Sequence, residues 1–372
     1  MSLPRVAVFT DTYLPTVNGV TYTIDTWRER WRARGGEMCV VYPGSDHVPT
    51  DGEHPVRSVG FPFYEGFRVG LPRVPGEVDG ADLVHAHTPF LLGLAGRRFA
   101  GRLDVPLVAS YHTPTSEYAN YVPAGPLSGL VGWTASRYER WYMNRADAVV
   151  VPSAPARDHL REMGVDARIE VVQNGVDTDV FRPADAETRA AFRERHGLPE
   201  GPLVGYTGRH GYEKRLQDLI AAGEDLAATL VIAGDGPARA DLQAQAADSD
   251  VDVRFLGFLD RAELPTFYSV LDVFAFPSPV ETQGLVALEA NACGTPVAGV
   301  DAGALADTVD DGETGYTAPA GDAAAFRAAI ERTLADRESL RESCLARRDP
   351  ISVEHAIDDL EAVYESVRAT DG

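Results

Sequence analysis

The stretch from Leu271 to Val300 constrains the fold of this chain more than any other segment. It holds a short apolar run that stops at Pro277, a helical segment from Gly284 to Cys293, and a second apolar run that Pro296 opens. A buried strand, a loop, a helix and another buried strand, in this order, are typical of parallel sheets covered by helices. The stretch therefore predicts an α/β fold.

Two carboxylates in the same stretch indicate a binding site. Glu281 lies in the loop before the helix and Glu289 lies inside the helix, with seven residues between them. The first N–H groups of a helix lack intrahelical partners and attract anions, so we expect nucleotide phosphates over Thr282 to Leu285. The two carboxylates would accept hydrogen bonds from hydroxyl groups on either side. The expected diphosphate contacts here are Gln283, Gly284 and Leu285.

Length and composition exclude several classes of protein. A chain of 372 residues can form two domains with full cores, and a net charge of -22 argues against nucleic-acid binding. No apolar run reaches the roughly 18 to 20 residues that span a bilayer, and the N-terminus enters a strand without a signal peptide. The three cysteines share no metal-ligand spacing. We therefore expect a cytoplasmic protein.

The charge is unevenly distributed. Residues 1–182 carry 18 Arg against 21 acidic residues, a net charge of -3, whereas the remainder carries 16 basic and 35 acidic residues, a net charge of -19. Arginine outnumbers lysine 33 to 1. Acid excess with few lysines predicts a halophilic protein whose carboxylates keep it soluble in high salt. The one lysine, Lys214, is then a candidate functional residue.

The N-terminal half begins with a strand from Arg5 to Phe9, a loop, and a helix that ends near Arg34. In this helix Trp27 and Trp31 alternate with arginines, and a spacing of four places both rings on one face. That face either packs into a core, leaving the arginines in solvent, or lies on anionic lipid. A second helix rich in aromatic and basic residues is expected over 127–145.

Histidines mark the ends of two predicted strands, which end at His87 and His112. Ligands of parallel α/β sheets bind at the carboxyl ends of strands, which favours a functional role for His112 and leaves His87 open. His85 is expected to be packed. After a turn cluster near residue 175 the alternation of strands and helices begins afresh, and Arg209 and Lys214 follow its first strand in a loop suited to a diphosphate.

The motifs DTYLPTVNGV, DLVHAHTPF, SYHT, NGVDTDVF, GRHGYEK, AGDGP and ETQGLVALEANACGTPV occur in one order along the chain. In this combination the sequence resembles glycosyltransferase family 4, of the GT-B fold. The resemblance implies two doubly wound Rossmann-like domains that face each other across a cleft. Residues 1–182 would bind the acceptor and 183–350 the nucleotide-sugar, while a helix in 351–372 would return to the N-terminal domain.

The resemblance also implies the roles of individual residues. The reaction would be retaining, with catalytic contacts from His112 and from Glu281, which would hold the hydroxyls of the transferred sugar. The remaining implied contacts are Arg209, Lys214 and Gly19 on the diphosphate and Glu289 on the ribose.

The chain has no Asp-x-Asp at a strand end and no clustered His or Cys, so we expect no metal and no cofactor besides the UDP- or GDP-hexose substrate. Positive charge and helix N-termini would then stabilise the leaving diphosphate. If the diphosphate leaves from the same face of the sugar on which the acceptor attacks, no protein nucleophile is needed. Glu281 as a covalent nucleophile is the competing reading.

The acceptor follows from a narrower resemblance. The opening motif, the SYHT segment with Tyr118 and Tyr121 downstream, and ETQGL resemble the branch that glycosylates diacylglycerol-type lipids or transfers mannose to lipid carriers. The expected partners are a nucleotide-sugar, a lipid acceptor and an anionic membrane, with peripheral attachment to the inner face of the cell membrane. A soluble sugar or sugar-phosphate acceptor is the alternative. Nucleotide-sugar epimerases and two-lobed solute-binding proteins are alternatives from other classes.

Overall fold

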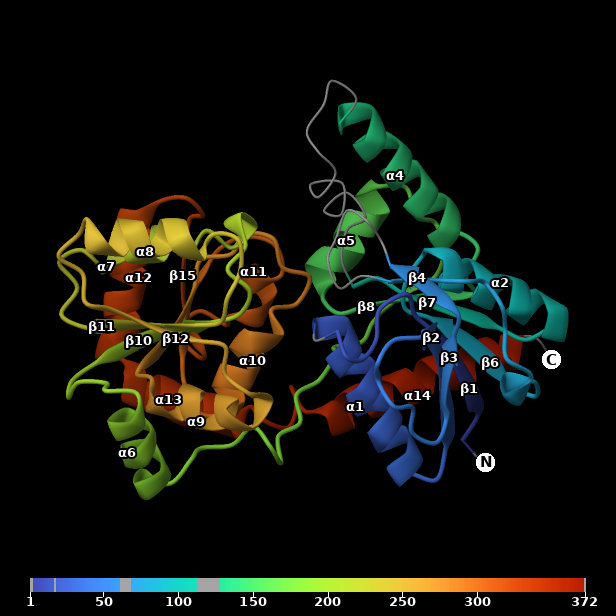
Figure 1. Ribbon diagram of the computed structural model, residues 1–372, viewed down its shortest axis with the longest axis horizontal. Coiled ribbons are helices and arrows are strands. Elements are labelled where there is room, and N and C mark those ends of the chain that lie inside the picture. Colours follow the sequence, from blue (N-terminus) through green and yellow to red (C-terminus); the bar gives the residue numbers. More distant parts are fainter. Residues whose placement is uncertain (1–2, 17, 61–67, 113–127, 371–372) are drawn as a thin grey trace. The chain divides into compact units, whose positions relative to one another are not determined.

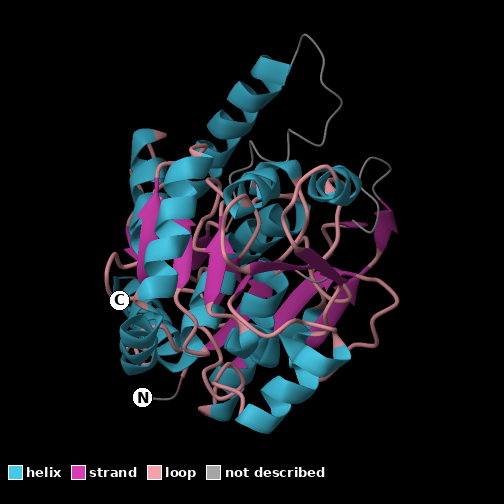
Figure 2. Cartoon of the chain, turned by 90° about the vertical axis from the view of Figure 1, so that its left-hand side faces the viewer, coloured by secondary structure: helices cyan, strands magenta, loops and turns pink. Residues whose placement is uncertain are grey.

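The computed structural model describes residues 3–16, 18–60, 68–112 and 128–370. The chain divides into two compact units: unit 1 is Met1–Asn174 with Val353–Gly372, and unit 2 is Gly175–Ser352. The predicted limit at 182 lies eight residues after the first of these divisions, and the predicted limit at 350 lies two residues before the second. Each unit contains a parallel sheet with helices on both faces, which confirms the predicted pair of Rossmann-like domains (Figures 1 and 2).

The sheet of unit 1 has the strand order β3-β2-β1-β6-β7-β8-β9, and all of its described pairings are parallel. A short antiparallel pair, β4 with β5, lies outside this sheet. The strands are β1 (Arg5–Phe9), β2 (Glu37–Pro43), β3 (Glu53–Val56), β4 (Ser58–Gly60), β5 (Arg68–Gly70), β6 (Leu83–Ala86), β7 (Leu107–Ser110), β8 (Ala148–Val151) and β9 (Ile169–Val171).

Alternation along β1 divides the core of unit 1 into two layers. Val6 and Val8 join a cluster with residues of α1 and α14, whereas Ala7 and Phe9 join a cluster with residues of α2, α4 and α5. This is the two-residue period of a strand buried on both faces. The helices are α1 (Gly19–Ala33), η1 (Gly76–Val78), α2 (Leu91–Leu103), α4 (Ser128–Met143), α5 (Ala154–Glu162) and α14 (Val353–Thr370).

Both tryptophans of α1 belong to the core, so the reading of this helix as lipid-facing is wrong. Trp27 is 1% exposed and Trp31 is 0% exposed. The indole Nε1 of Trp27 donates to the carbonyl of Asn174 at 2.7 Å, and the ring of Trp31 meets Tyr364 of α14 at a centroid distance of 5.3 Å. The face is buried because α14, from the end of the chain, packs on α1.

The expected solvated arginine face of α1 also needs correction at one position. Arg28 is 4% exposed, and its guanidinium lies 2.9 Å from the carboxylate of Glu53, which β3 carries and which is itself buried. Glu53 also contacts His47 at 2.8 Å and the Thr50 hydroxyl at 2.8 Å. A buried ion pair persists where further hydrogen bonds satisfy most of its remaining atoms. Here both Glu53 oxygens and both terminal nitrogens of Arg28 have partners, whereas Arg28 Nε has none among the described residues.

The sheet of unit 2 has the order β12-β11-β10-β13-β14-β15, again with parallel pairings. Its strands are β10 (Leu203–Thr207), β11 (Thr229–Ala233), β12 (Val253–Gly257), β13 (Val273–Phe276), β14 (Val297–Val300) and β15 (Gly315–Ala318). The strand, helix and strand expected over 271–300 are present as β13, α10 (Leu285–Ala292) and β14.

Helices cover both faces of this sheet, with α7, α8 and α12 on one face and α6, α9, α10 and α13 on the other (Figure 1). The sequence order changes at β10, which lies between β11 and β13. Such a reversal opens a crevice at the carboxyl ends of the strands. The other helices are η2 (Tyr212–Lys214), α6 (Ala186–Arg195), α7 (Leu216–Gly223), α8 (Arg239–Ala247), η3 (Arg261–Glu263), α9 (Leu264–Val270), α11 (Leu305–Thr308), α12 (Ala323–Ala335) and α13 (Arg337–Ala346).

Candidate functional site

Two glycine-containing loops meet at the carboxyl ends of β10 and β11. A Cβ on Gly234 would lie 2.0 Å from the carbonyl oxygen of Gly208, and a Cβ on Gly236 would lie 2.7 Å from that of His210. These positions therefore require glycine, since any side chain would separate the loops. The contact fixes the loop that leads from β10 to Lys214.

Lys214 and Glu281, which the sequence assigned to the site separately, form an ion pair. The Lys214 Nζ lies 2.7 Å from Glu281 Oε1, and the two side chains are 20% and 15% exposed. Lys214 ends η2 after β10, whereas Glu281 lies between β13 and α10, so neighbouring strands bring them together. An ammonium group has three donors, and the pair leaves capacity for an anion. Arg209 forms its own ion pair with Glu213.

A glycine outside the recognised motifs supports the loop that carries Glu281. Gly303 has a φ of 56°, and a Cβ there would lie 2.8 Å from the carbonyl oxygen of Pro279. The next residue, Ala304, donates its N–H to the carbonyl of Glu281 at 3.0 Å. The sequence alone did not reveal this support, because the close approach of Gly303 to another backbone depends on the fold.

The entry into α10 holds the other predicted diphosphate residues. Gln283 is 3% exposed, and its carbonyl accepts a hydrogen bond from the Thr308 hydroxyl at 2.5 Å. Gly284 occupies the N-cap position with a φ of 79°, and the helix begins at Leu285. The first backbone N–H groups of α10 thus begin beside the loop that holds Glu281, an arrangement suited to an anion.

Glu289, the predicted ribose ligand, faces α9 and η3. Its Oε2 accepts from the Tyr268 hydroxyl at 2.8 Å, and its Oε1 lies 3.3 Å from the Arg261 guanidinium. Burial raises the pKa of this carboxyl, and the charge of Arg261 opposes the rise. Because a carboxylate oxygen can accept more than one hydrogen bond, a ribose hydroxyl would share these oxygens. The ribose role stays a prediction.

In unit 1 the structure joins the histidines of two strand ends. The Nδ1 of His87 lies 2.8 Å from the Nε2 of His112, with the rings stacked at a centroid distance of 5.1 Å. His85 is fully buried, as expected, and contacts the Tyr364 hydroxyl at 2.7 Å and the Ser110 hydroxyl at 2.8 Å. His87, which the sequence left open, therefore positions the His112 ring directly.

Burial keeps these imidazoles neutral. It lowers the pKa of His85 to about 3 and that of His112 to about 4, and it holds the pKa of His87 well below its usual range. Positive charge at His112 would lower the pKa of His85 and His87 further. In the neutral pair one facing nitrogen donates and the other accepts. At neutral pH His112 can thus offer a hydrogen bond but no positive charge.

The buried neutral histidines predict a loss of stability in mild acid. An unfolded histidine takes up a proton near pH 6.5, whereas His85 in the folded protein does so only near pH 3. The stabilisation is therefore complete above pH 6.5 and decreases as the pH falls from there toward 3. From pH 7.5 to 5.5 His85 alone should lower the free energy of unfolding by about 1.4 kcal/mol.

Urea unfolding of the parent and of His85→Gln at both pH values measures this contribution. The variant should lose about 1.4 kcal/mol less than the parent between pH 7.5 and 5.5. The control, His355→Gln, removes an imidazole of unit 1 whose side chain is 50% exposed, and so corrects for the loss of a histidine as such. Equal losses in parent and His85→Gln would show that His85 is not held neutral.

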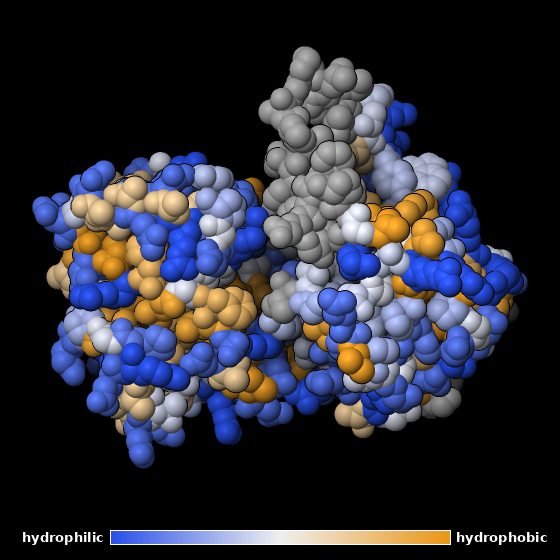
Figure 3. All heavy atoms as spheres, viewed as in Figure 1, coloured by the Kyte–Doolittle hydropathy of each residue, from blue (hydrophilic) through white to orange (hydrophobic). Residues whose placement is uncertain are grey.

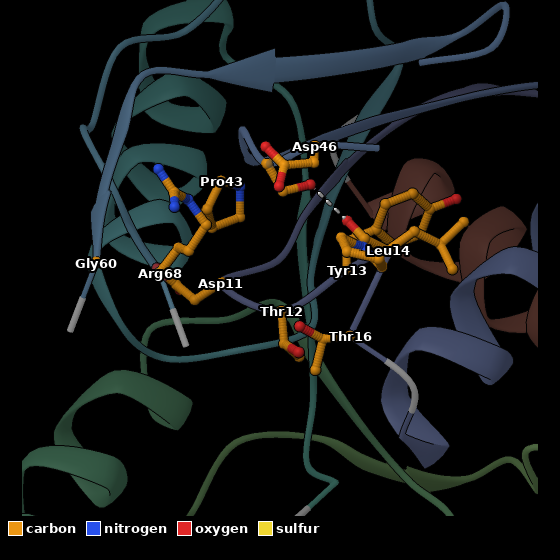
Figure 4. Close-up of a pocket in the computed structure, with 11 residues that line it drawn as sticks. Asp11, Thr12, Tyr13, Leu14, Thr16, Pro43, Asp46, Gly60 and Arg68 are labelled. Atoms are coloured by element: carbon orange, nitrogen blue, oxygen red, sulfur yellow. Dashed lines mark hydrogen bonds between the residues drawn. The ribbon is translucent and has the colours of Figure 1, made fainter. Parts of the chain in front are cut away.

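A cavity of ≈ 290 Å³ lies beside the carboxyl ends of β1 and β2 in unit 1. Figure 4 shows Asp46, Arg68, Thr12 and Thr16 around it. Asn18 caps α1 by accepting from Thr21 N–H at 2.9 Å, and its amide donates to the Thr12 hydroxyl at 2.9 Å. Nothing in the motifs pointed to Asp46 or Arg68.

Gly19 is the first residue of α1, directly after the capping residue Asn18. Its approach to the diphosphate stays a prediction. Tyr118 and Tyr121, which contributed to the acceptor inference, lie outside the described residues.

No group of three or more His, Cys, Asp or Glu side chains in 3–16, 18–60, 68–112 and 128–370 could hold a metal ion. No helix in these same ranges is long and apolar enough to cross a membrane.

Known proteins identify the family. Residues 17–180 match the model described as Glycosyltransferase Family 4, and residues 188–346 match Glycosyl transferases group 1. A GDP-mannose-dependent alpha-mannosyltransferase of Mycolicibacterium smegmatis is 33% identical over 98% of this chain and 100% of its own length. The chain belongs to glycosyltransferase family 4. The enzyme is therefore a glycosyltransferase, as the motifs indicated.

Another relative of this glycosyltransferase and a solved structure are consistent with this assignment. An alpha-monoglucosyldiacylglycerol synthase of Streptococcus pneumoniae is 30% identical over 79% of the chain and 70% of its own length. Among solved structures, Anabaena HepE in complex with UDP has a TM-score of 0.78 at 19% identity, over 97% of this chain and 100% of that one. At such low identity this likeness shows the fold alone.

Proposed function

We propose that this glycosyltransferase moves a hexose from a nucleoside-diphosphate sugar to a hydroxyl group of a membrane lipid, with retention of the anomeric configuration. The observation that carries the proposal is the Lys214–Glu281 pair, with a nitrogen–oxygen distance of 2.7 Å, beside the N-terminus of α10. A cation, helix N–H groups and a carboxylate together suit a diphosphate that adjoins sugar hydroxyls.

In the proposed reaction the bond between sugar C1 and the diphosphate oxygen breaks, and the acceptor oxygen bonds to C1 on the same face. The acceptor proton passes to the departing diphosphate, so no protein nucleophile is needed. Lys214 and the first N–H groups of α10 would stabilise the charge on the leaving group without a metal. Glu281 would hold the sugar hydroxyls, Glu289 the ribose, and neutral His112 a further sugar group.

The lipid acceptor is supported by a relative and by the distribution of charge. The relative named alpha-monoglucosyldiacylglycerol synthase acts, by its name, on a lipid. Residues 1–182 carry a net charge of -3, against -19 for the rest, which permits the first half to approach an anionic membrane. For the donor, one relative is named for GDP-mannose, so a GDP-hexose is tested beside a UDP-hexose.

A soluble sugar is the second candidate acceptor, and the cavity of unit 1 is compatible with it as well as with a glycolipid. Charged and hydroxyl side chains, including Asp46, Arg68 and Thr12, line this cavity of ≈ 290 Å³. Such a lining suits a polar ring, which a free sugar and the headgroup of a glycolipid both present.

The test is a transfer assay in detergent micelles that contain diacylglycerol or a glycolipid, with UDP- or GDP-hexose as donor. The proposal predicts one nucleoside diphosphate released per glycolipid formed, and an α-linked product from an α-linked donor. A β-linked product would overturn retention, and product with free sugars alone would favour the soluble acceptor. Donor converted to an epimer without release of nucleoside diphosphate would identify an epimerase.

A further inference from the structure

We infer that one face of unit 1, formed by α2 and α4, docks on the surface of an anionic lipid bilayer; this rests on the proposed lipid acceptor. We call it the α2–α4 face. It is made of Leu91, Arg97, Trp133, Arg137, Trp141 and Arg145.

The face exposes large side chains that a soluble protein would ordinarily bury. Trp133 is 58% exposed, Trp141 is 38% exposed and Leu91 is 41% exposed. This contrasts with Trp27 and Trp31 of α1, which are 1% and 0% exposed. In Figure 3 pale and orange spheres lie over α2 and α4 with deep blue ones around them. Tryptophan rings prefer the headgroup region of a bilayer, where one edge is apolar and the other wet.

Arginines accompany each exposed ring. Along α4, residues 133, 137, 141 and 145 follow at a spacing of four and alternate Trp, Arg, Trp, Arg, so they form one stripe. The guanidinium of Arg137 lies 4.9 Å from the Trp133 ring centre, and those of Arg145 and Arg97 lie 4.3 and 5.4 Å from the Trp141 ring centre. Stacked guanidinium groups can still donate to phosphate oxygens from their edges, although one nitrogen of Arg145 already donates to the Trp141 carbonyl at 2.8 Å.

The local charge opposes that of the whole chain. Residues 91–103 and 128–145 together contain six arginines and one carboxylate, Glu139, which is 2% exposed. Three of these arginines, Arg97, Arg137 and Arg145, belong to the face, whereas Arg102 pairs with Asp79. The full chain has a net charge of -22, so this face is locally basic on an acidic protein. Complementary charge favours an anionic surface, and the acidic remainder turns other faces away from it.

A bilayer fits this face better than a nucleic acid or a protein partner. The aliphatic side chain of Leu91 would find no stacking partner on a nucleic acid, whereas it can enter the acyl boundary of a membrane. The stripe of residues 133–145 runs along the helix, and an extended lipid surface can contact all of it at once.

Tryptophan fluorescence can test the docking directly, because the chain has four tryptophans and only two are on this face. Phosphatidylglycerol vesicles should shift the emission to the blue, and brominated phosphatidylglycerol should quench it, whereas phosphatidylcholine vesicles should do neither. The fully buried Trp27 and Trp31 supply a constant background. In Trp133→Phe/Trp141→Phe the shift should vanish while the vesicles still sediment the protein.

Two variants measure the charge contribution by co-sedimentation with the same vesicles. Each arginine near an anionic surface contributes about fivefold to partition at low salt, so Arg137→Ser/Arg145→Ser should lower it about 25-fold. The control, Arg168→Ser/Arg254→Ser, changes the net charge equally at side chains 45% and 46% exposed elsewhere, and should stay within about twofold. Raising the salt to 1 M should reduce the difference between the parent and Arg137→Ser/Arg145→Ser, the face variant.

The outcomes separate this inference from the proposed function. A parent that makes glycolipid in detergent yet shows no blue shift on anionic vesicles would overturn the docking face and leave the function intact. Unchanged vesicle binding by Arg137→Ser/Arg145→Ser would also overturn it, as would equal sedimentation of this variant and Arg168→Ser/Arg254→Ser. Tighter binding to a single-stranded nucleic acid than to vesicles, lost in the face variant, would assign the face to another partner. Docking without transfer to any lipid would instead contradict the proposed acceptor.

Discussion

Replacing Lys214 with alanine is expected to lower kcat/KM for the nucleotide-sugar about 10²- to 10³-fold, the usual effect of removing one group that stabilises a developing charge. The ammonium lies 2.7 Å from Glu281 beside the start of α10. Its loss removes the cation and leaves a carboxylate, 15% exposed, that repels a diphosphate. Steady-state kinetics at saturating acceptor measures the effect.

Two further variants decide what the lysine does. Arg215→Ala is the matched control, since this neighbouring cation is paired with Asp218 at 2.6 Å, and activity should stay within about threefold. In the double variant Lys214→Ala/Glu281→Gln the repulsion is removed as well. If Lys214 contacts the diphosphate, the double variant recovers at most the part of the loss that the repulsion causes and stays well below the parent. Full recovery would mean that Lys214 only neutralises Glu281 and that the sugar hydroxyls do not need the Glu281 carboxylate.

The second large effect is on stability. Trp27→Ala should lower the free energy of unfolding of unit 1 by about 3 to 5 kcal/mol, because it removes a fully buried ring. It also leaves the Asn174 carbonyl without the indole donor that lies 2.7 Å away. Urea unfolding followed by far-UV circular dichroism measures the change.

Trp133→Ala is the control for this stability prediction. The same chemical change is made at a ring that is 58% exposed, and it should cost less than about 1 kcal/mol. Similar losses in the two variants would contradict the assignment of α1 to the core and of α4 to the surface.

The comparison of these tryptophans shows where sequence reasoning stops. Trp27 with Trp31 and Trp133 with Trp141 both occur among arginines on predicted helices, so local patterns cannot separate them. What separates them is α14, which begins at Val353 and packs on α1. A contact between segments so distant in the chain leaves no trace in either helix, and the lipid-facing reading of α1 was wrong for this reason.

The strand, helix and strand around α10 could be predicted from the sequence because the residues that mark their limits are local. Pro277, Gly284, Gly294 and Pro296 mark the limits of a strand, a helix and a strand whose apolar residues lie between them. The strand β3 could not be predicted from the sequence, because it contains a proline and an acidic residue. Glu53 is buried only through its pairing with Arg28. Strand propensity cannot reveal such a tertiary partner.

In the candidate site, too, local features could be read from the sequence and tertiary contacts could not. Lys214 and Glu281 stood out as a unique lysine and as an acid in an anion-binding loop, and the order of the strands then brought them together. The contact between His87 and His112 depends on the pairing of β6 with β7, which the sequence implied only as adjacent predicted strands. The pairing of Glu289 with Tyr268 and Arg261 depends on helix packing and had no local signal.

The most direct test of the central claim is a thermal-shift panel of the purified protein in high salt against UDP, GDP, ADP and their hexose conjugates. A ligand that binds only the folded state raises the free energy of unfolding by RT ln(1 + [L]/Kd), about 2.7 kcal/mol at a concentration 100 times Kd, and so raises the melting temperature. The account predicts that one nucleoside diphosphate and its hexose conjugate raise the melting temperature of the parent, and that Lys214→Ala abolishes the rise. No rise with any of these ligands at millimolar concentration would contradict the nucleotide-sugar site.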